Sequence, residues 1–429
     1  MASGMGGLAG DTRFLHIGPH KSGTTAIQGA FHLARPRLRE QGLVYIGENR
    51  QPAGAAQQAA GLPAMFGSSH GRDSYWRELL DEVEAADGLR PVISSEFFCM
   101  ADDEAARRIV EDLGGSRVHV IVTLRPLAKI LPAQWQQFIQ AGQRRSYEEW
   151  LDDMFNHSPS GQSVRPFWRR HDHPALVNRW LDIVGAQNLT VIAVDDSDPG
   201  MLLRSFEEIV DLPDGFLAPD ETQANRSLSY AEAEFFRRFN RAFLDEGLEE
   251  LLYGRYIRRG LAPHLKYHYR PAREDAVIRT PAWAMERAAK LGAEAQTTLS
   301  GLGLRTMGDL AVLGAVPENR VGTPSHGGSI PVEAAAHAVV GTLAEVERRE
   351  RSREKAAEKE AAAAARKAAA AAREKADKAA EKARRRDPDR LPNVSARRLA
   401  RELLRRGVRK IGRLRRRMLR GPRNRGAAR

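Results

Sequence analysis

The sequence is poor in cysteine and has no long hydrophobic run. Cys99 is the one cysteine among 429 residues, which excludes an internal disulfide framework and a cysteine-based zinc site and is typical of a reducing compartment. No apolar run approaches the roughly 18–20 residues that a membrane-spanning helix needs. Residues 1–13 lack the basic start and the apolar stretch of a secretory signal. We therefore expect a cytoplasmic protein.

Charge is distributed unevenly along the chain. The net charge is +12, but residues 341–429 hold 31 lysines and arginines against 12 acidic residues. The first 340 residues hold 36 basic and 43 acidic residues and are therefore mildly acidic. The basic isoelectric point belongs to the tail, so we expect no specific nucleic-acid binding by the globular part.

Short apolar segments alternate with segments of helical periodicity in the first half of the chain. Apolar runs predict buried strands at 12–18, 91–95, 117–124 and 188–194. Helical spacing is found at 27–38, after Pro126, and at 146–155, 173–184 and 199–211. Such alternation requires crossover connections, so it predicts an α/β fold of three layers around a mostly parallel sheet.

We predict four parts. Residues 1–312 form the α/β domain, which is mainly helical from about 225, and the Gly- and Pro-rich segment 313–341 is a linker. Residues 342–387 consist mostly of Ala, Lys, Arg and Glu, which favours a single solvated helix or a disordered spacer. They lack the Leu/Ile seam that specifies a coiled coil. Residues 388–429 are a basic tail.

Within the tail, residues 396–420 have the pattern of a basic amphipathic helix. Such a helix can lie on an anionic membrane surface, here the inner face of the membrane, or dock on an acidic partner. It can also touch nucleic acid through phosphates alone, without sequence specificity. A solvated terminal helix with no target carries equal weight.

The segment FLHIGPHKSGTTAIQ, residues 14–28, has the layout of a strand, a glycine-bounded turn and a helix. Glycines permit unusual dihedral angles, Lys21 adds a positive charge, and the start of the helix adds free N–H groups. This combination predicts an anion site that binds phosphate; the alternative is a glycine-rich turn without a ligand. The candidate binding residues are Gly18, His20, Lys21, Ser22, Gly23, Thr24 and Thr25.

The order Lys-Ser-Gly-Thr-Thr differs from that of nucleotide triphosphatases, in which Gly-Lys-Ser/Thr follows four intervening residues. It resembles the phosphosulfate-binding loop of the sulfotransferase family. HIGPHKSGTT and the later RP…QWQQ are similar to a bacterial branch of that family, over about residues 12–215. The resemblance implies a P-loop-like fold, 3′-phosphoadenosine 5′-phosphosulfate as the donor substrate, and no metal.

Arg125 stands where the strand at 117–124 gives way to a helix. In sulfotransferases an arginine at this place grips the 3′-phosphate of the donor together with a serine eight residues later. Arg125 matches, but Ala133 replaces the serine. The substitution removes one hydroxyl donor, so we expect weaker recognition of the 3′-phosphate.

Sulfuryl transfer needs a base for the acceptor and stabilisation of the leaving phosphate. Glu96 lies just past the strand at 91–95, where open α/β sheets place ligands, and heparan-type sulfotransferases carry a glutamate base in a similar place. Lys21 suits the stabilising task. His20 is the second candidate for the base, whereas His16 is expected to pack within the sheet.

Other polar groups have simpler explanations. The His-Asp-His run at 171–173 is expected to be a helix start capped by its aspartate, or a wall of the acceptor site. His264 and His268 fall one helical turn apart without a third ligand nearby, so no metal site is expected. Asn225 and Arg226 either approach the nucleotide or precede a helix capped by the serines that follow.

These observations favour a sulfotransferase that acts on a hydroxyl or amine of a carbohydrate, lipid or small-molecule acceptor. A degenerate, non-catalytic sulfotransferase-like binding protein is the alternative that Ala133 keeps open. A P-loop kinase is less favoured because the Gly-Lys-Ser/Thr order is missing.

Overall fold

The computed structural model describes residues 10–63, 74–86, 88–157, 164–220, 226–272, 277–323, 329–386 and 401. The chain divides into two compact units, Met1–Leu343 and Ala344–Arg429. The predicted amphipathic helix at 396–420 lies outside the described residues apart from Arg401, and Asn225 lies outside them as well.

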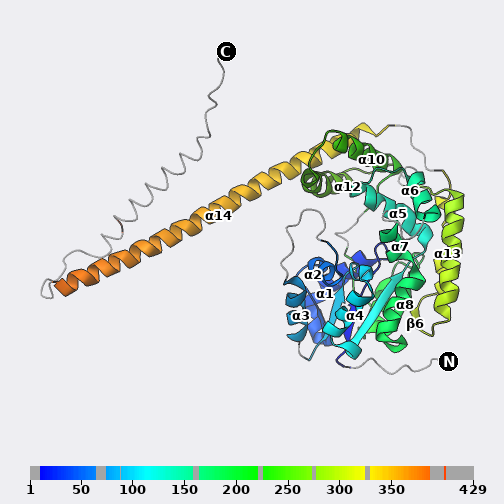
Figure 1. Ribbon diagram of the computed structural model, residues 1–429, viewed down its shortest axis with the longest axis horizontal. Coiled ribbons are helices and arrows are strands. Elements are labelled where there is room, and N and C mark those ends of the chain that lie inside the picture. The colour runs from blue at the N-terminus through cyan, green and yellow to red at the C-terminus, as the bar shows by residue number, and fades with distance from the viewer. Residues whose placement is uncertain are drawn as a thin grey trace, which may run out of the picture. The chain divides into compact units, whose positions relative to one another are not determined.

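A parallel sheet forms the centre of the first unit (Figure 1). Its strands lie in the order β2-β3-β1-β4-β5-β6, and every neighbouring pair is parallel. The strands are β1 (Arg13–His16), β2 (Leu43–Tyr45), β3 (Arg90–Ser94), β4 (Val118–Leu124), β5 (Leu189–Ala193) and β6 (Arg305–Met307). The predicted α/β fold with a parallel sheet is therefore confirmed.

Helices occupy most of the remaining described chain. Those of the first half are α1 (Thr24–Leu38), α2 (Ala53–Ala59), α3 (Tyr75–Glu84), α4 (Asp103–Asp112), α5 (Leu127–Gln140), α6 (Tyr147–Asn156), α7 (Arg165–His171), α8 (His173–Val184) and α9 (Met201–Val210). Those of the second half are α10 (Tyr230–Asp245), α11 (Glu250–Leu252), α12 (Ala262–His268), α13 (Ala282–Ser300) and α14 (Val332–Arg386), with a π-helical segment at Tyr253–Leu261.

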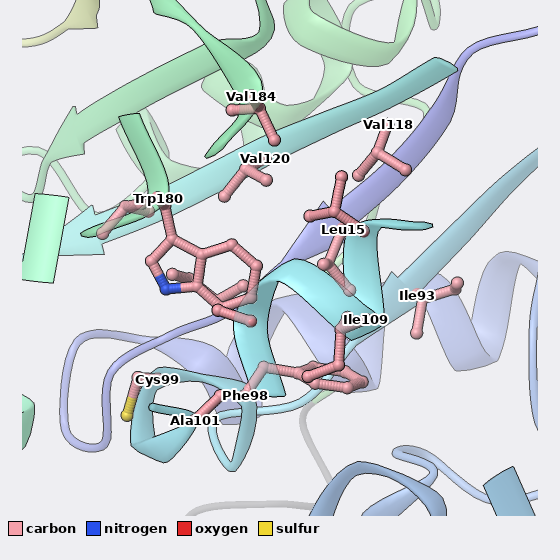
Figure 2. Packing of buried hydrophobic residues seen from close by; sticks show 14 of the residues in the cluster. Leu15, Ile93, Phe98, Cys99, Ala101, Ile109, Val118, Val120, Trp180 and Val184 are labelled. Carbon is pink, nitrogen blue, oxygen red and sulfur yellow. The ribbon is translucent and has the colours of Figure 1, made fainter. Parts of the chain in front are cut away.

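The two faces of the sheet bury different residues because side chains alternate along a strand. Leu15 and Val120 belong to a core with α4 and α8, and Figure 2 shows Trp180 and Ile109 reaching this face. Phe14 and its neighbours on the opposite face belong to a core with α1 and α9. Helices thus cover both faces, which makes three layers.

A third hydrophobic cluster joins α5, α6, α10, α12 and α13 to the beginning of α14, and Figure 1 shows several of these helices gathered beside the sheet. Arg226 supports this cluster: its guanidinium pairs with the buried Glu232 at 2.6 Å and donates to the carbonyl oxygen of Leu265. Ser229 caps α10 in a reciprocal capping box with Glu232. The alternative that a helix cap explains this segment is therefore confirmed.

Two short strands and the start of one helix lie where the sequence pattern did not predict them. Neither β2 nor β6 was predicted, and β6 lies in a stretch expected to be mainly helical. Helix α14 begins at Val332, inside the segment 313–341 expected to be a linker, because Ala334 and Ala338 are buried in the third cluster. The remaining division into domains stays a prediction.

Helix α14 continues through the Ala-rich segment to Arg386. Its predicted pairs one turn apart are present, at 2.6 Å between Lys378 and Glu374 and 2.8 Å between Arg385 and Glu381. No helix of the described chain has both the length and the apolar composition needed to cross a membrane.

Gly292 in α13 provides a test of the packing between α13 and the short helix Leu310–Gly314 that follows β6. A Cβ atom at Gly292 would lie 2.0 Å from the carbonyl oxygen of Leu313, so we expect Gly292→Ala to force a backbone shift. The free energy of unfolding should fall by about 1–3 kcal/mol in urea denaturation. Gly301→Ala is the control, since its Cβ would meet no atom closer than 3.5 Å. Equal stability of the two variants would contradict this packing.

Candidate functional site

The turn between β1 and α1 lies at the carboxyl ends of the central strands. Strand order reverses at β1, because the chain next forms β2 and β3 on one side and then β4 on the other. Ligands of open α/β sheets bind at such a reversal. Three residues of the turn, Gly18, Lys21 and Gly23, have positive φ angles of 85°, 68° and 98°.

Both glycines of the turn are required by close packing as well as by their dihedral angles. A Cβ atom on Gly18 would lie 2.9 Å from the Cα of Glu96, and one on Gly23 would lie 2.4 Å from the side chain of Leu202. Gly18 therefore lets the turn approach the end of β3. This approach brings Glu96 next to the turn.

Hydroxyl groups fasten the turn to β4. The Ser22 Oγ donates to the carbonyl oxygen of Pro19 at 2.6 Å and lies 2.6 Å from the Thr123 Oγ1. Because the one Ser22 proton goes to Pro19, the Thr123 hydroxyl donates its proton to the Ser22 Oγ. The Thr123 Oγ1 also lies 3.1 Å from the carbonyl oxygen of Gly18, which accepts a hydrogen bond from the Thr123 N–H. Ser22 and Thr123 are fully buried. The Ser22 side chain thus holds the turn rather than facing the cavity, and only its backbone N–H stays a predicted anion contact.

His16 belongs to the same buried network, as its expected place within the sheet requires. Its Nδ1 lies 2.8 Å from the Ser94 Oγ and its Nε2 lies 3.2 Å from the Thr123 Oγ1. Burial lowers the pKa of His16 to about 3, so the ring is neutral and can donate at one nitrogen and accept at the other. The network therefore joins β1, β3 and β4 beneath the turn.

One cavity of about 190 Å³ gathers most of the predicted site residues. The turn, the end of β3, the end of β4 and α5 contribute to its wall. The lining residues are His20, Lys21, Gly23, Thr24, Thr25, Glu96, Arg125 and Gln137. Gln137 was not singled out from the sequence, and its buried Oε1 has no hydrogen-bond partner among the described residues.

Arg125 is held directly against the turn. Its Nη1 donates to the carbonyl oxygen of Lys21 at 3.2 Å, and its Nε and Nη2 donate to the Asp196 Oδ2 at 3.1 and 2.5 Å. Desolvation lowers the pKa of Lys21, Glu96 opposes this shift, and Arg125 adds to it. The cavity thus has two neighbouring cationic side chains on one wall and a carboxylate on another.

Glu96 is fixed by amide donors from two other elements. The Gln28 Nε2 donates to its Oε2 at 2.9 Å, and the Gln51 Nε2 donates to its Oε1 at 3.4 Å. Gln51 is itself fixed by the Ser95 hydroxyl, which donates to its Oε1 at 3.1 Å. The carboxylate therefore has a defined orientation at the cavity.

His20 lines the cavity but is poorly suited to take a proton. Its ring packs edge-on against Phe97, with ring centroids 5.4 Å apart. Burial, together with the positive charges of Arg170 and Lys21, holds the pKa of His20 well below its usual value. A buried, neutral His20 ring packed against Phe97 lacks the fixed orientation that hydrogen-bond donors give the Glu96 carboxylate at the same cavity.

The other histidine groups are explained by helix capping and by packing. Asp172 caps α8 by accepting from the Ala175 N–H, as expected, and the rings of His171 and His173 are buried. His264 and His268 lie on α12 with ring centroids 4.1 Å apart, and His337 lies within 6.1 Å of both. Within the described chain no group of three or more His, Cys, Asp or Glu is arranged to hold a metal ion.

Lys266 on α12 is a cation that the sequence pattern did not reveal. Desolvation lowers its pKa to about 8, and the positive charges of Lys21 and Arg226 contribute in the same direction. The helical part of the chain thus adds positive potential near the turn. No local motif marks Lys266, because its proximity arises only from tertiary packing.

Comparison with solved structures finds a remote likeness to a sulfotransferase from Alicyclobacillus acidocaldarius. The two share 16% sequence identity, the match covers 56% of this chain and 94% of that chain, and the TM-score is 0.35. No family model and no curated protein matches the sequence. What this protein does must therefore be argued from the residues of its site.

Thr123 tests the hydroxyl network beneath the turn. Thr123→Val keeps the shape of the side chain but leaves Ser22 and His16 without one hydrogen-bond partner each. We expect the free energy of unfolding to fall by about 1–3 kcal/mol, measured by urea denaturation. Thr306→Val in β6 is the matched control, because the Thr306 hydroxyl has one local contact at 3.4 Å. A loss no larger than that of the control would show that the network does not stabilise the turn.

Proposed function

We propose that the protein is a sulfotransferase that transfers a sulfuryl group from 3′-phosphoadenosine 5′-phosphosulfate to a hydroxyl or amine acceptor. The observation that carries this proposal is the 3.2 Å hydrogen bond from Arg125, at the end of β4, to the carbonyl oxygen of Lys21 in the turn between β1 and α1. Two cations and the free N–H groups at the start of α1 there face a single cavity. Such a wall suits a ligand with more than one negative charge.

The residues present fit the phosphosulfate end of the donor. The turn offers backbone donors, and the hydroxyls of Thr24 and Thr25 lie at the same cavity. Lys21 is placed to stabilise the negative charge that develops on the leaving phosphate as the sulfur–oxygen bond breaks. Arg125 and the N-terminus of α1 add to the same positive potential.

Glu96 is the proposed base. It faces the cavity together with Lys21, and Gln28 and Gln51 hold its two carboxylate oxygens. A proton from the acceptor hydroxyl or amine would pass to a Glu96 oxygen while the acceptor atom attacks sulfur and the phosphate leaves on the opposite side. The acceptor classes proposed are carbohydrates, lipids and small molecules.

Calorimetric titration separates this proposal from its alternatives. We expect micromolar binding of adenosine 3′,5′-bisphosphate, the donor product, and no binding of ATP with Mg²⁺. The reverse result would support a kinase. Binding of the bisphosphate without transfer to any acceptor class would support a non-catalytic binding protein, and failure of both nucleotides to bind would contradict the proposal.

Lys21 is expected to act in both binding and transfer. Lys21→Ala should reduce the rate of transfer from labelled donor by about 10²–10³-fold, because a charge aimed at the leaving phosphate is lost. The melting temperature should not change, since Lys21 lies at the surface of the turn. Lys290→Ala on the exposed side of α13 is the control. Equal transfer rates of the two variants would mean that the turn does not bind the donor.

Glu96 should affect chemistry rather than donor binding. Glu96→Gln keeps the shape of the side chain, and we expect a fall in turnover of about 10²–10⁴-fold, the range for loss of a general base. Affinity for adenosine 3′,5′-bisphosphate should stay within about twofold of the wild-type value, a difference well below 1.4 kcal/mol. Turnover at the wild-type rate would assign the base elsewhere.

A further inference from the structure

The wall of the cavity beside the turn is polar throughout. Its described lining residues are two cations, the Glu96 carboxylate, a histidine, two threonines, a glycine and Gln137, and none of them is a large apolar residue. Pockets that bind ligands with a large hydrocarbon part are lined mainly by hydrophobic and aromatic side chains. This wall offers hydrogen bonds instead, so it suits a ligand that carries several polar groups.

Gln137 brings an unused acceptor to this wall. It lies on α5, and its Oε1 is buried without a hydrogen-bond partner among the residues that the structure describes. A neighbouring amide on the same helix is used within the protein, because the Gln136 Oε1 accepts from the Leu228 N–H at 2.7 Å. A buried oxygen without a partner is costly, so the Gln137 oxygen points to a partner that arrives with a ligand.

The phosphosulfate end of the donor cannot supply that partner. Phosphate and sulfuryl groups present acceptor oxygens, which fit the N–H groups and the cations of the turn. An amide oxygen that faced them would add repulsion between lone pairs. The Gln137 Oε1 needs an O–H or N–H donor, and the acceptor substrate of sulfuryl transfer carries groups of this kind.

Glu96 and Gln137 reach the cavity from the two sides of the turn. Glu96 follows β3 and Gln137 belongs to the helix that follows β4, and β3 and β4 are the two neighbours of β1 in the sheet. The reacting hydroxyl or amine is proposed to lie at Glu96, which leaves a second donor group of the same molecule for Gln137. Both residues line one cavity of about 190 Å³, so the two groups of the acceptor must be close together.

We propose that Gln137 selects the acceptor, because its Oε1 accepts a hydrogen bond from a hydroxyl or amino group beside the one that is sulfated. The acceptor is then a polyol or amino alcohol of the carbohydrate type, with neighbouring donor groups on one ring. This inference rests on the proposed function and narrows its acceptor class. The lone hydroxyl of a phenol or a lipid alcohol leaves the Gln137 oxygen without a partner, and a site built to hydrogen-bond a substrate group discriminates against an analogue that lacks it.

Two probe acceptors with the same ring test this inference. The first is trans-1,2-cyclohexanediol, which has two neighbouring hydroxyls, and the second is cyclohexanol, which has a single hydroxyl. Transfer of label from 3′-phosphoadenosine 5′-phosphosulfate to each probe is measured with the full chain. We expect kcat/KM per hydroxyl group to be at least about tenfold higher for the diol than for cyclohexanol.

Variants of two glutamines on α5 assign this preference to a residue. Gln137→Leu removes the amide, so kcat/KM per hydroxyl should become equal for the two probes. Gln137→Glu keeps an acceptor oxygen and should keep the preference; the effect of its added charge on donor binding cancels, because both probes are compared in the same variant. Gln140→Leu is the matched control, since the Gln140 Nε2 donates to the Gln136 carbonyl oxygen at 2.9 Å and Gln140 is not among the described residues that line the cavity.

A preference in Gln137→Leu as large as in Gln140→Leu would overturn the role of Gln137. Weaker binding of adenosine 3′,5′-bisphosphate in Gln137→Leu than in the control would place the amide against the donor and overturn that role as well. Equal values for the two probes in the wild-type protein, or transfer to neither, would refute the polyol acceptor while bisphosphate binding still supports the donor site. Failure of the bisphosphate to bind would refute this inference together with the proposed function.

Discussion

The hydrogen bond between the Ser22 and Thr123 hydroxyls is the interaction on which the site depends. It fastens a turn containing three positive φ angles to the central strand of the sheet, in a place closed to water. In such surroundings a hydroxyl without a partner costs more than the hydrogen bond itself gains, so the arrangement is strongly specified. The position of Lys21 relative to Arg125 follows from it, because Thr123 precedes Arg125 by two residues.

Electrostatics then give the site its character. Lys21 and Arg125 meet where the turn contacts the end of β4, and Lys266 adds to the positive potential from the helical part. Glu96 is held at the cavity by amides and Asp196 by the cations themselves. A carboxylate held by neutral donors keeps its lone pairs available for a proton, whereas one held by two cations acts as a counter-ion. The two acidic groups therefore have different electrostatic surroundings.

Much of the fold could be predicted from the sequence because the central strands are buried on both faces. The run from Val118 to Leu124 is apolar throughout, and parallel strands covered by helices have this composition. The strands β2 and β6 have three residues each, too few for a periodic pattern, and β6 is half-exposed at the edge of the sheet. The sequence pattern predicts the start of α14 several residues too late. The buried residues in its first turns are alanines, which give a weaker hydrophobic periodicity than large apolar side chains.

The candidate site was predictable where its residues are close together in the sequence. Gly18 to Thr25 form one local motif, so their shared position follows from the chain itself. Asp196, Gln51 and Lys266 reach the site from separate elements, and no spacing rule connects them to the turn. Ser22 shows that membership of a local motif does not fix the role of a side chain. Its place in the motif suggested a ligand contact, but its hydroxyl holds the backbone of the turn.

The most direct measurement is a crystal structure of the full chain with adenosine 3′,5′-bisphosphate bound. The account predicts the 5′-phosphate in the turn, within hydrogen-bonding distance of Lys21 and the first N–H groups of α1. It also predicts the 3′-phosphate within hydrogen-bonding distance of Arg125. A nucleotide bound elsewhere on the protein, with the turn empty, would contradict the account.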